Sequence, residues 1–187
     1  MQGPTTPAPT APTGLPLAPG RWHLDPAHTW VGFAIRHLGV SKVRGRFTEV
    51  DAELVIGETI DDTQVSATIA LASIDTGQPD RDANVRGAEM LDVERRPTMT
   101  FESTGVRGAG ARWLVDGELT IGDVTRPVPL DVELGGVEVA FDGRKHAGFE
   151  ATAELRRRDF DLGFGAIGAM LGDVVKIELD LQFVEPD

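Results

Sequence analysis

The 187-residue sequence contains no cysteine and no tyrosine, and only 6% of its residues are aromatic. The absence of cysteine excludes disulfide bonds, thiolate metal sites and a cysteine nucleophile. A shortage of aromatic side chains leaves few large groups to fill a wide interior. No stretch approaches the roughly 18 uninterrupted apolar residues of a membrane-spanning helix.

Basic residues are scarce, and the formal net charge is −12. This charge disfavours a nucleic-acid partner, because phosphate binding needs clustered Lys and Arg. It also disfavours adsorption to an anionic membrane surface. With 41% hydrophobic residues, a chain of this length suits one domain with a buried core.

The first twenty residues consist mostly of Pro, Thr, Ala and Gly. We predict a disordered tail over residues 1–20, with a Pro-rich docking motif as the alternative, and a single domain over residues 21–187. The start lacks the basic residues and the apolar run of a secretion signal, so we expect a cytoplasmic protein. The oligomeric state stays open, with a homodimer among the alternatives.

The clearest pattern lies at the end of the chain, over residues 175–184. Five apolar residues alternate there with four polar ones, which indicates a strand with one apolar and one wet face. The apolar positions are Val175, Ile177, Leu179, Leu181 and Phe183.

Similar patterns predict strands over residues 22–25, 29–37, 43–56, 65–74, 99–101, 113–121, 128–141 and 149–155. Gly135-Gly136 inside one of them is interpreted as a bulge. We therefore expect about eight antiparallel strands.

Two passages break this pattern. Residues 78–91 predict a short helix, with Asp80 or Asp82 as its cap. Residues 166–171 predict a turn of helix or a lid-like loop. Arg81-Asp82 and Arg158-Asp159 in these passages indicate either ion pairs that hold a loop or an arginine that meets a polar head group.

Apolar residues also gather in and around the two passages. They indicate either closure of one end of the core or an apolar entrance. They are Met90, Leu91, Phe160, Leu162, Phe164, Ile167, Met170 and Leu171.

Many antiparallel strands, each with one wet face, form either a sandwich or a closed barrel. We favour a barrel with a cavity, because several strand positions are small and few aromatic residues are available to fill the interior. The small positions are Gly32, Ala34, Ala67, Ala70, Ala151 and Ala153.

Catalytic motifs are scarce. The spacing of the four histidines does not resemble a metal-ligand signature, so we predict no metal site. No nucleophile elbow or phosphate loop is present, and the G-x-G-x-x-G of residues 163–168 lacks the β-α-β context of a dinucleotide site. His37 shares a strand face with Phe33 and Ile35, so it is a candidate to contact a ligand head group. An alternative is an enzyme for a small hydrophobic substrate, using His37 with Arg or Asp at the barrel mouth.

Several motifs resemble those of the YceI-like family over residues 21–185. They are Trp22-x-Leu24-Asp25-x-x-His28-Thr29, Val43-Arg44-Gly45-Arg46-Phe47, Ile74-Asp75-Thr76, Arg81-Asp82, Arg96-Pro97-x-Met99-x-Phe101, Gly117-x-Leu119-Thr120-Ile121 and Arg158-x-Phe160. The chain departs from the family pattern after Arg81-Asp82, where residues 84–91 replace a more aromatic stretch.

The resemblance implies an all-β fold, an antiparallel lipocalin-like barrel of about eight strands with one or two short helices. It also implies a non-enzymatic protein without a cofactor that holds an isoprenoid or similar long-chain amphiphile in its lumen. The predicted ligand-binding residues are Val31, Phe33, Ile35, His37, Phe47, Arg81, Met99, Phe101, Phe149, Arg158, Phe160, Phe164, Ile167 and Met170.

Overall fold

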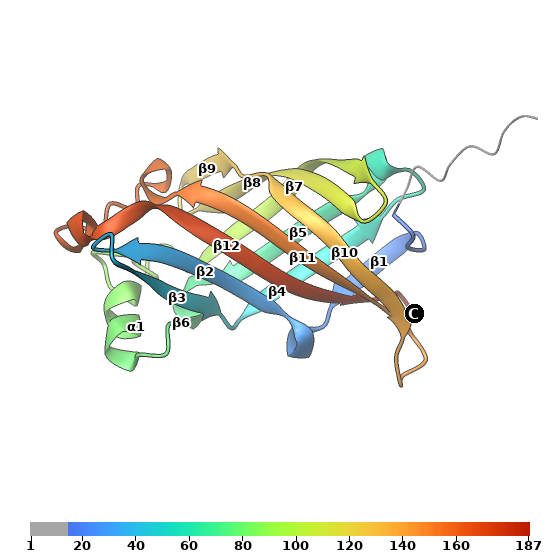
Figure 1. Ribbon diagram of the computed structural model, residues 1–187, viewed down its shortest axis with the longest axis horizontal. Coiled ribbons are helices and arrows are strands. Elements are labelled where there is room, and N and C mark those ends of the chain that lie inside the picture. Colours follow the sequence, from blue (N-terminus) through green and yellow to red (C-terminus); the bar gives the residue numbers. More distant parts are fainter. Residues whose placement is uncertain (1–14) are drawn as a thin grey trace, which may run out of the picture.

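Twelve strands account for most of residues 15–187, the part of the chain that the computed structural model describes (Figure 1). They are β1 (Gly20–Leu24), β2 (Trp30–His37), β3 (Ser41–Phe47), β4 (Val50–Ile56), β5 (Gln64–Ala70), β6 (Ile74–Asp75), β7 (Thr98–Ala109), β8 (Arg112–Ile121), β9 (Val124–Pro127), β10 (Leu130–Val139), β11 (Lys145–Arg156) and β12 (Leu171–Val184).

Eight of these strands form a closed ring. The order is β1-β4-β5-β7-β8-β10-β11-β12, and β12 pairs with β1 to complete the circle. All the pairings are antiparallel. The predicted all-β barrel of about eight strands is therefore confirmed.

Alternation along β12 decides which side chains line the barrel. Ile177 pairs with Ala153 of β11 and with Phe33 of β2, so the apolar side chains of three strands meet inside. Lys176 and Glu178 project outward and are exposed. The strand begins four residues before the predicted Val175, at Leu171.

A three-stranded wing made of β2, β3 and β6 extends one end of the barrel (Figure 1). The predicted strand over residues 43–56 is wrong in one respect, because it is two strands, β3 and β4, separated by Thr48 and Glu49. The Thr48 amide donates to Ser73 rather than to a neighbouring strand, and this diversion ends β3. The predicted strand over residues 65–74 is also interrupted, by the 3-10 helix of residues 71–73 between β5 and β6.

Short helices occupy the connections. The one α-helix of the described residues is α1 (Pro79–Arg86), where a short helix was predicted. Its N-cap residue is Gln78, which makes no side-chain cap, so the expected caps Asp80 and Asp82 do not form. The 3-10 helices are η1 (Pro26–His28), η2 (Ile60–Asp62), η3 (Leu71–Ser73), η4 (Arg157–Phe160) and η5 (Ile167–Met170).

The expected bulge at Gly135-Gly136 is present, because the register of β10 against β11 shifts between Leu134 and Gly136. It lets one long strand bend around the barrel. Within residues 15–187 there is no helix with both the length and the apolar character needed to cross a bilayer.

The segment before β1 packs on the barrel. Leu17 is buried in a cluster with Trp22 and Leu54, and the Trp22 indole N–H donates to the carbonyl of Ala18 at 3.0 Å. The tail was predicted over residues 1–20. Residues 1–14 lie outside the described residues, whereas Leu15 and Leu17 contact the domain.

Candidate ligand-binding site

The inner wall of the barrel is apolar around its circumference. Across β4, β5, β7 and β8, the inward row runs Ala52, Ala67, Phe101 and Leu119. Across β11 and β12, Ala151 faces Leu179. The only charged side chains buried among residues 15–187 are Asp82 and Arg157, and both belong to the connections rather than to the inward row.

A narrow apolar cavity of about 60 Å³ lies in the lumen. Its wall is apolar apart from Thr63, and Leu15 of the N-terminal segment contributes to it. The other lining residues are Leu54, Val65, Val106, Trp113, Val115, Leu130, Val132, Phe149, Ala151, Leu181 and Phe183. Pockets for drug-sized ligands usually hold about 300–1,000 Å³, so the lumen is narrower than expected. Trp22, Trp113 and Phe160 are almost completely buried and take up much of the interior.

Small residues do not all face the lumen. Ala67, Ala151 and Ala153 line it, as their register with Phe101, Leu179 and Ile177 shows. The expectation for Gly32 and Ala34 is wrong. A side chain added at Gly32 would meet the Trp30 indole, which is 45% exposed on the outer surface.

Ala34 lies between Lys176 and Arg44 on that outer face. Ala70 follows the inward-facing Ile69 and so points outward as well.

Several predicted ligand-binding residues converge at the α1 end of the barrel. Phe101 and Phe160 belong to the buried cluster there, and four half-buried residues pack against it: Phe33, Phe47, Met99 and Phe164. The rings of Phe33 and Phe47 lie 5.8 Å apart, in a tilted arrangement. These residues form one continuous apolar surface from β2 to the loop after η4.

Phe149 lies apart from this group. It packs edge-on against Phe183 at 6.1 Å, in the second buried cluster, and lines the cavity. Val31 and His37 are half-buried on β2, and Ile35 is buried. Within residues 15–187 no hydrogen bond or ion pair involves the His37 ring. Ile167 and Met170 are 38% and 41% exposed at the outer end of the barrel.

Arg81 has a structural contact. It donates to the side-chain oxygen of Thr76 at 2.7 Å and to the Thr76 carbonyl at 2.8 Å. The Thr76 hydroxyl in turn donates to the buried Asp82 at 2.5 Å. Thr76 therefore connects Arg81 with Asp82, and the three residues fix the turn that precedes α1.

Arg158 lies on the surface near Asp173, with a side chain that is 66% exposed. The neighbouring Arg157 is 1% exposed, and sequence reasoning missed its role. Its guanidinium has five N–H donors. It donates to the carbonyls of Leu162, Gly163, Gly168, Leu171 and Gly172, at 2.8–3.2 Å.

Burial in this loop lowers the pKa of Arg157, and the nearby positive charge of Arg158 lowers it further. The side chain is still charged at neutral pH, because a guanidinium does not lose its proton in proteins. Arg157 therefore shapes the loop over residues 161–172 without a carboxylate partner. The signal that could have found it is the parity of β11, which turns alternate residues inward.

A second hollow, of about 300 Å³, opens on the outer surface beside the end of β11. Phe160 and Leu155 form part of its wall, and Arg126, Arg156, Glu154 and Asp159 bring charges to it. Phe160 also belongs to the buried core, so this cleft is a place where the apolar interior comes close to charged groups at the surface.

Among residues 15–187, no group of three or more His, Cys, Asp or Glu side chains is placed to bind a metal ion.

Comparison with known proteins identifies relatives over most of the chain. The family model described as the YceI-like domain matches residues 22–183. A UPF0312 protein of Photorhabdus laumondii is 36% identical over 135 residues, which cover 72% of this chain and 70% of that protein. Protein YceI of Salmonella arizonae is 38% identical over 136 residues, which cover 72% and 71%.

Solved structures share the fold. BcnA of Burkholderia cenocepacia superposes with a TM-score of 0.76 at 22% identity, covering 85% of this chain and 98% of that chain. A polyisoprenoid binding domain from Saccharophagus degradans superposes with a TM-score of 0.65 at 16% identity, covering 88% and 98%. At these identities the likeness establishes the barrel architecture alone.

Proposed function

Because the chain belongs to the YceI-like family, we propose that its barrel binds an isoprenoid lipid or a similar long-chain amphiphile, such as a polyprenyl quinone. The protein would act as a carrier, store or buffer of this lipid rather than as an enzyme. The description of one structural relative as a polyisoprenoid binding domain supports the choice of ligand class.

The observation that carries the proposal is the apolar inner wall. Ile177, Leu179 and Leu181 of β12 point into the barrel, yet they are only half-buried. Inward apolar side chains that remain partly accessible offer contact surface to a hydrocarbon chain. Burial stabilises such a complex by about 0.8 kcal/mol per CH₂ group, so tight binding needs little polar chemistry.

The narrow cavity sets a condition on this function. About 60 Å³ is too little for a long chain, so binding must be accompanied by outward movement of side chains such as Trp113 or Phe149. Leu15, which lines the cavity, belongs to the N-terminal segment that precedes β1. The polar head of an amphiphile would suit the cleft beside Arg126 and Arg156, where charged groups adjoin the core.

Analysis of the co-purified lipid tests the proposal. We expect native mass spectrometry of the gently purified protein to show a bound species, and organic extraction to release a polyprenyl compound. An Ala151→Phe variant should lose that species, because Ala151 is 3% exposed and lines the cavity. A matched Thr152→Phe variant changes the exposed neighbour and should keep it. Absence of any lipid from the parent protein, or equal loss in both variants, would contradict the proposal.

A further inference from the structure

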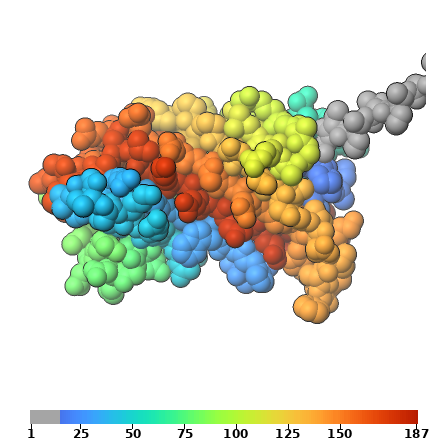
Figure 2. Space-filling model, viewed as in Figure 1, coloured from blue at the N-terminus to red at the C-terminus, as the bar shows by residue number. Residues whose placement is uncertain are grey.

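Four apolar side chains project from one end of the barrel, and we call them the apolar tip. They come from the β2–β3 turn and from η5, and they are 59%, 80%, 38% and 41% exposed: Leu38, Val40, Ile167 and Met170. The Leu38 amide donates to the Met170 carbonyl at 2.8 Å, so the two loops form one surface. Figure 2 shows these segments side by side at one end of the molecule, the turn in blue and η5 in red-orange.

The apolar tip is free of charge. Neither residues 38–41 nor residues 162–172 contain an Asp, Glu, Lys or Arg. Arg157 holds the second loop from within through its five hydrogen bonds. The exposed apolar groups are thus presented on a fixed frame, and a contiguous patch of this kind marks an interaction surface.

The turn that exposes these side chains has a strained backbone at Leu38. Its φ is +53°, and Gly39 follows with φ of +68°. Asn, Asp and Gly are the residues that suit such a turn, whereas a leucine is disfavoured there. A large apolar residue at this position therefore indicates a role for its side chain outside the fold.

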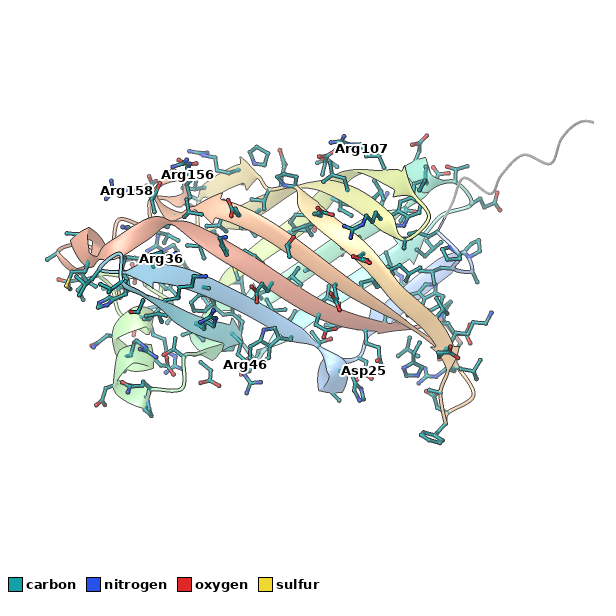
Figure 3. The ribbon with its side chains drawn as sticks, in the orientation of Figure 1. Asp25, Arg36, Arg46, Arg107, Arg156 and Arg158 are labelled. Carbon is teal, nitrogen blue, oxygen red and sulfur yellow. The ribbon has the colours of Figure 1, made fainter. Side chains whose placement is uncertain are left out.

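Three cations flank the apolar tip, and we call them the basic collar: Arg36, Lys42 and Arg44. Residues 36–46 contain no acidic residue, in a chain whose net charge is −12. Arg36 pairs in register with Lys42, which places both beside the turn on the outer face of the wing. Figure 3 shows Arg36 at the same end of the molecule as Arg156 and Arg158.

The charges of the basic collar are not neutralised within the described part of the protein. Arg36, Lys42 and Arg44 make no ion pair among residues 15–187, whereas the nearby Arg46 pairs with Asp75 at 3.4 Å. The carboxylate of Asp173, at the start of β12, lies 3.4 Å from Arg156 and 3.9 Å from Arg158. The collar is thus available to an external anion.

We propose that the apolar tip and the basic collar together dock on the surface of an anionic lipid bilayer. Apolar side chains that enter the interface and cations that meet anionic head groups are the two components of reversible membrane attachment. Charge complementarity selects this occupant, because the basic collar is a local positive patch without acidic residues in a chain whose net charge is −12. Docking would place the α1 end of the lumen against the bilayer, so the inference goes beyond the lipid-binding role proposed above.

Vesicle sedimentation with the full chain tests this proposal. We expect binding to vesicles of phosphatidylcholine with about one third phosphatidylglycerol, weakening with salt, and little binding to phosphatidylcholine alone. Removing a collar charge should lower the partition coefficient about fivefold, so the triple variant Arg36→Gln, Lys42→Gln, Arg44→Gln should lose about 100-fold. Leu38→Asn with Met170→Gln should also detach the protein.

The matched control is the triple variant Arg107→Gln, Arg112→Gln, Arg144→Gln, which makes the same change in net charge at exposed positions away from the apolar tip. Its affinity for vesicles should stay within threefold of that of the parent protein, and far above that of the collar variant. Equal loss in both triple variants, no vesicle binding by the parent, or equal binding to neutral vesicles would overturn the proposal.

Two further measurements separate the alternatives. Sedimentation velocity without vesicles would overturn the proposal if it showed a dimer that Leu38→Asn dissociates, since the apolar tip would then bind a second copy. The vesicles contain no isoprenoid, so their binding is independent of lumen occupancy. Lipid extraction from the collar variant should still release the co-purified compound, which distinguishes failed docking from a failed lipid-binding function.

Discussion

The guanidinium carbon of Arg157 lies 5.2 Å from the centre of the Phe164 ring, within the loop that both residues shape. The same guanidinium satisfies five backbone carbonyls. An Arg157→Met variant would leave these oxygens without their donors, and we expect a loss of about 3–5 kcal/mol of folding free energy, or roughly 10 °C in melting temperature.

Thermal unfolding followed by circular dichroism measures this change. Arg158→Met serves as the control, because the Arg158 side chain is 66% exposed and its replacement should alter stability by about 0.5 kcal/mol or less. A similar melting temperature for the two variants would show that the buried guanidinium does not hold the loop.

Close approach of β8 to Phe101 predicts a sensitive position at Gly117. A methyl group added there would lie 2.2 Å from the Phe101 ring and 2.9 Å from the carbonyl oxygen of Glu102. Gly117→Ala should therefore cost about 1–3 kcal/mol in urea unfolding, through displacement of the ring in the core.

The exposed Gly136 on β10 has no atom within 4 Å of the corresponding position. Gly136→Ala should leave stability unchanged or raise it by about 0.5–1 kcal/mol. If both alanine variants unfolded at the same urea concentration, close packing at Gly117 would be refuted.

Acid sensitivity is expected at the corner between β1 and β2. Burial alone would raise the pKa of Asp25, but hydrogen bonds from the His28 side chain and the Ala27 amide outweigh it and leave the pKa lowered. A carboxyl group with a depressed pKa stabilises the fold above its unfolded pKa of about 3.9, and this contribution disappears as the pH falls through the folded value.

The comparison to make is between the parent protein and Asp25→Asn, by urea unfolding from pH 6 to pH 3. The parent should be the more stable at pH 6, and the difference should shrink below about pH 4. Thr68→Ala, at an exposed position of β5, removes no ionisable group, so its difference in stability from the parent should stay constant over this pH range. A difference that stayed constant down to pH 3 would exclude the predicted linkage.

Leu17 should contribute to stability although it precedes the first strand. It is 8% exposed and packs with Trp22 and Leu54. Leu17→Ala should lower the free energy of unfolding by about 2 kcal/mol, by loss of buried contacts and creation of a cavity. The exposed Val139 provides a control, and Val139→Ala should have little effect. Equal stability of the two variants would mean that the segment before β1 does not anchor to the barrel.

Strand alternation explains how much of the fold could be predicted. In β12, each inward residue is apolar and each outward residue between Lys176 and Asp180 is charged, so the period of two is unambiguous. The break between β3 and β4 left no such signal, because it arises from the capture of Thr48 by Ser73, about 25 residues away. The local alternation of apolar and polar residues does not reveal tertiary hydrogen bonds of this kind.

The site was harder to predict than the fold. Aromatic residues such as Phe33 and Phe101 could be assigned to the interior from their strand faces. The buried partner in the Arg156-Arg157-Arg158 run could not be chosen from composition, because all three residues have the same side chain. The parity of β11 is the signal that separates them, because its buried positions Ala147, Phe149 and Ala151 share their parity with Arg157.

The wing formed by β2, β3 and β6 joins the ring along β12 on one side, whereas its far edge is only the two-residue strand β6. The wing is therefore paired over a long stretch with β12 on one side and ends in a short, weakly paired strand on the other. If the barrel binds a lipid as proposed, opening at this weakly paired edge would admit the ligand without breaking the hydrogen bonds of the eight-stranded ring.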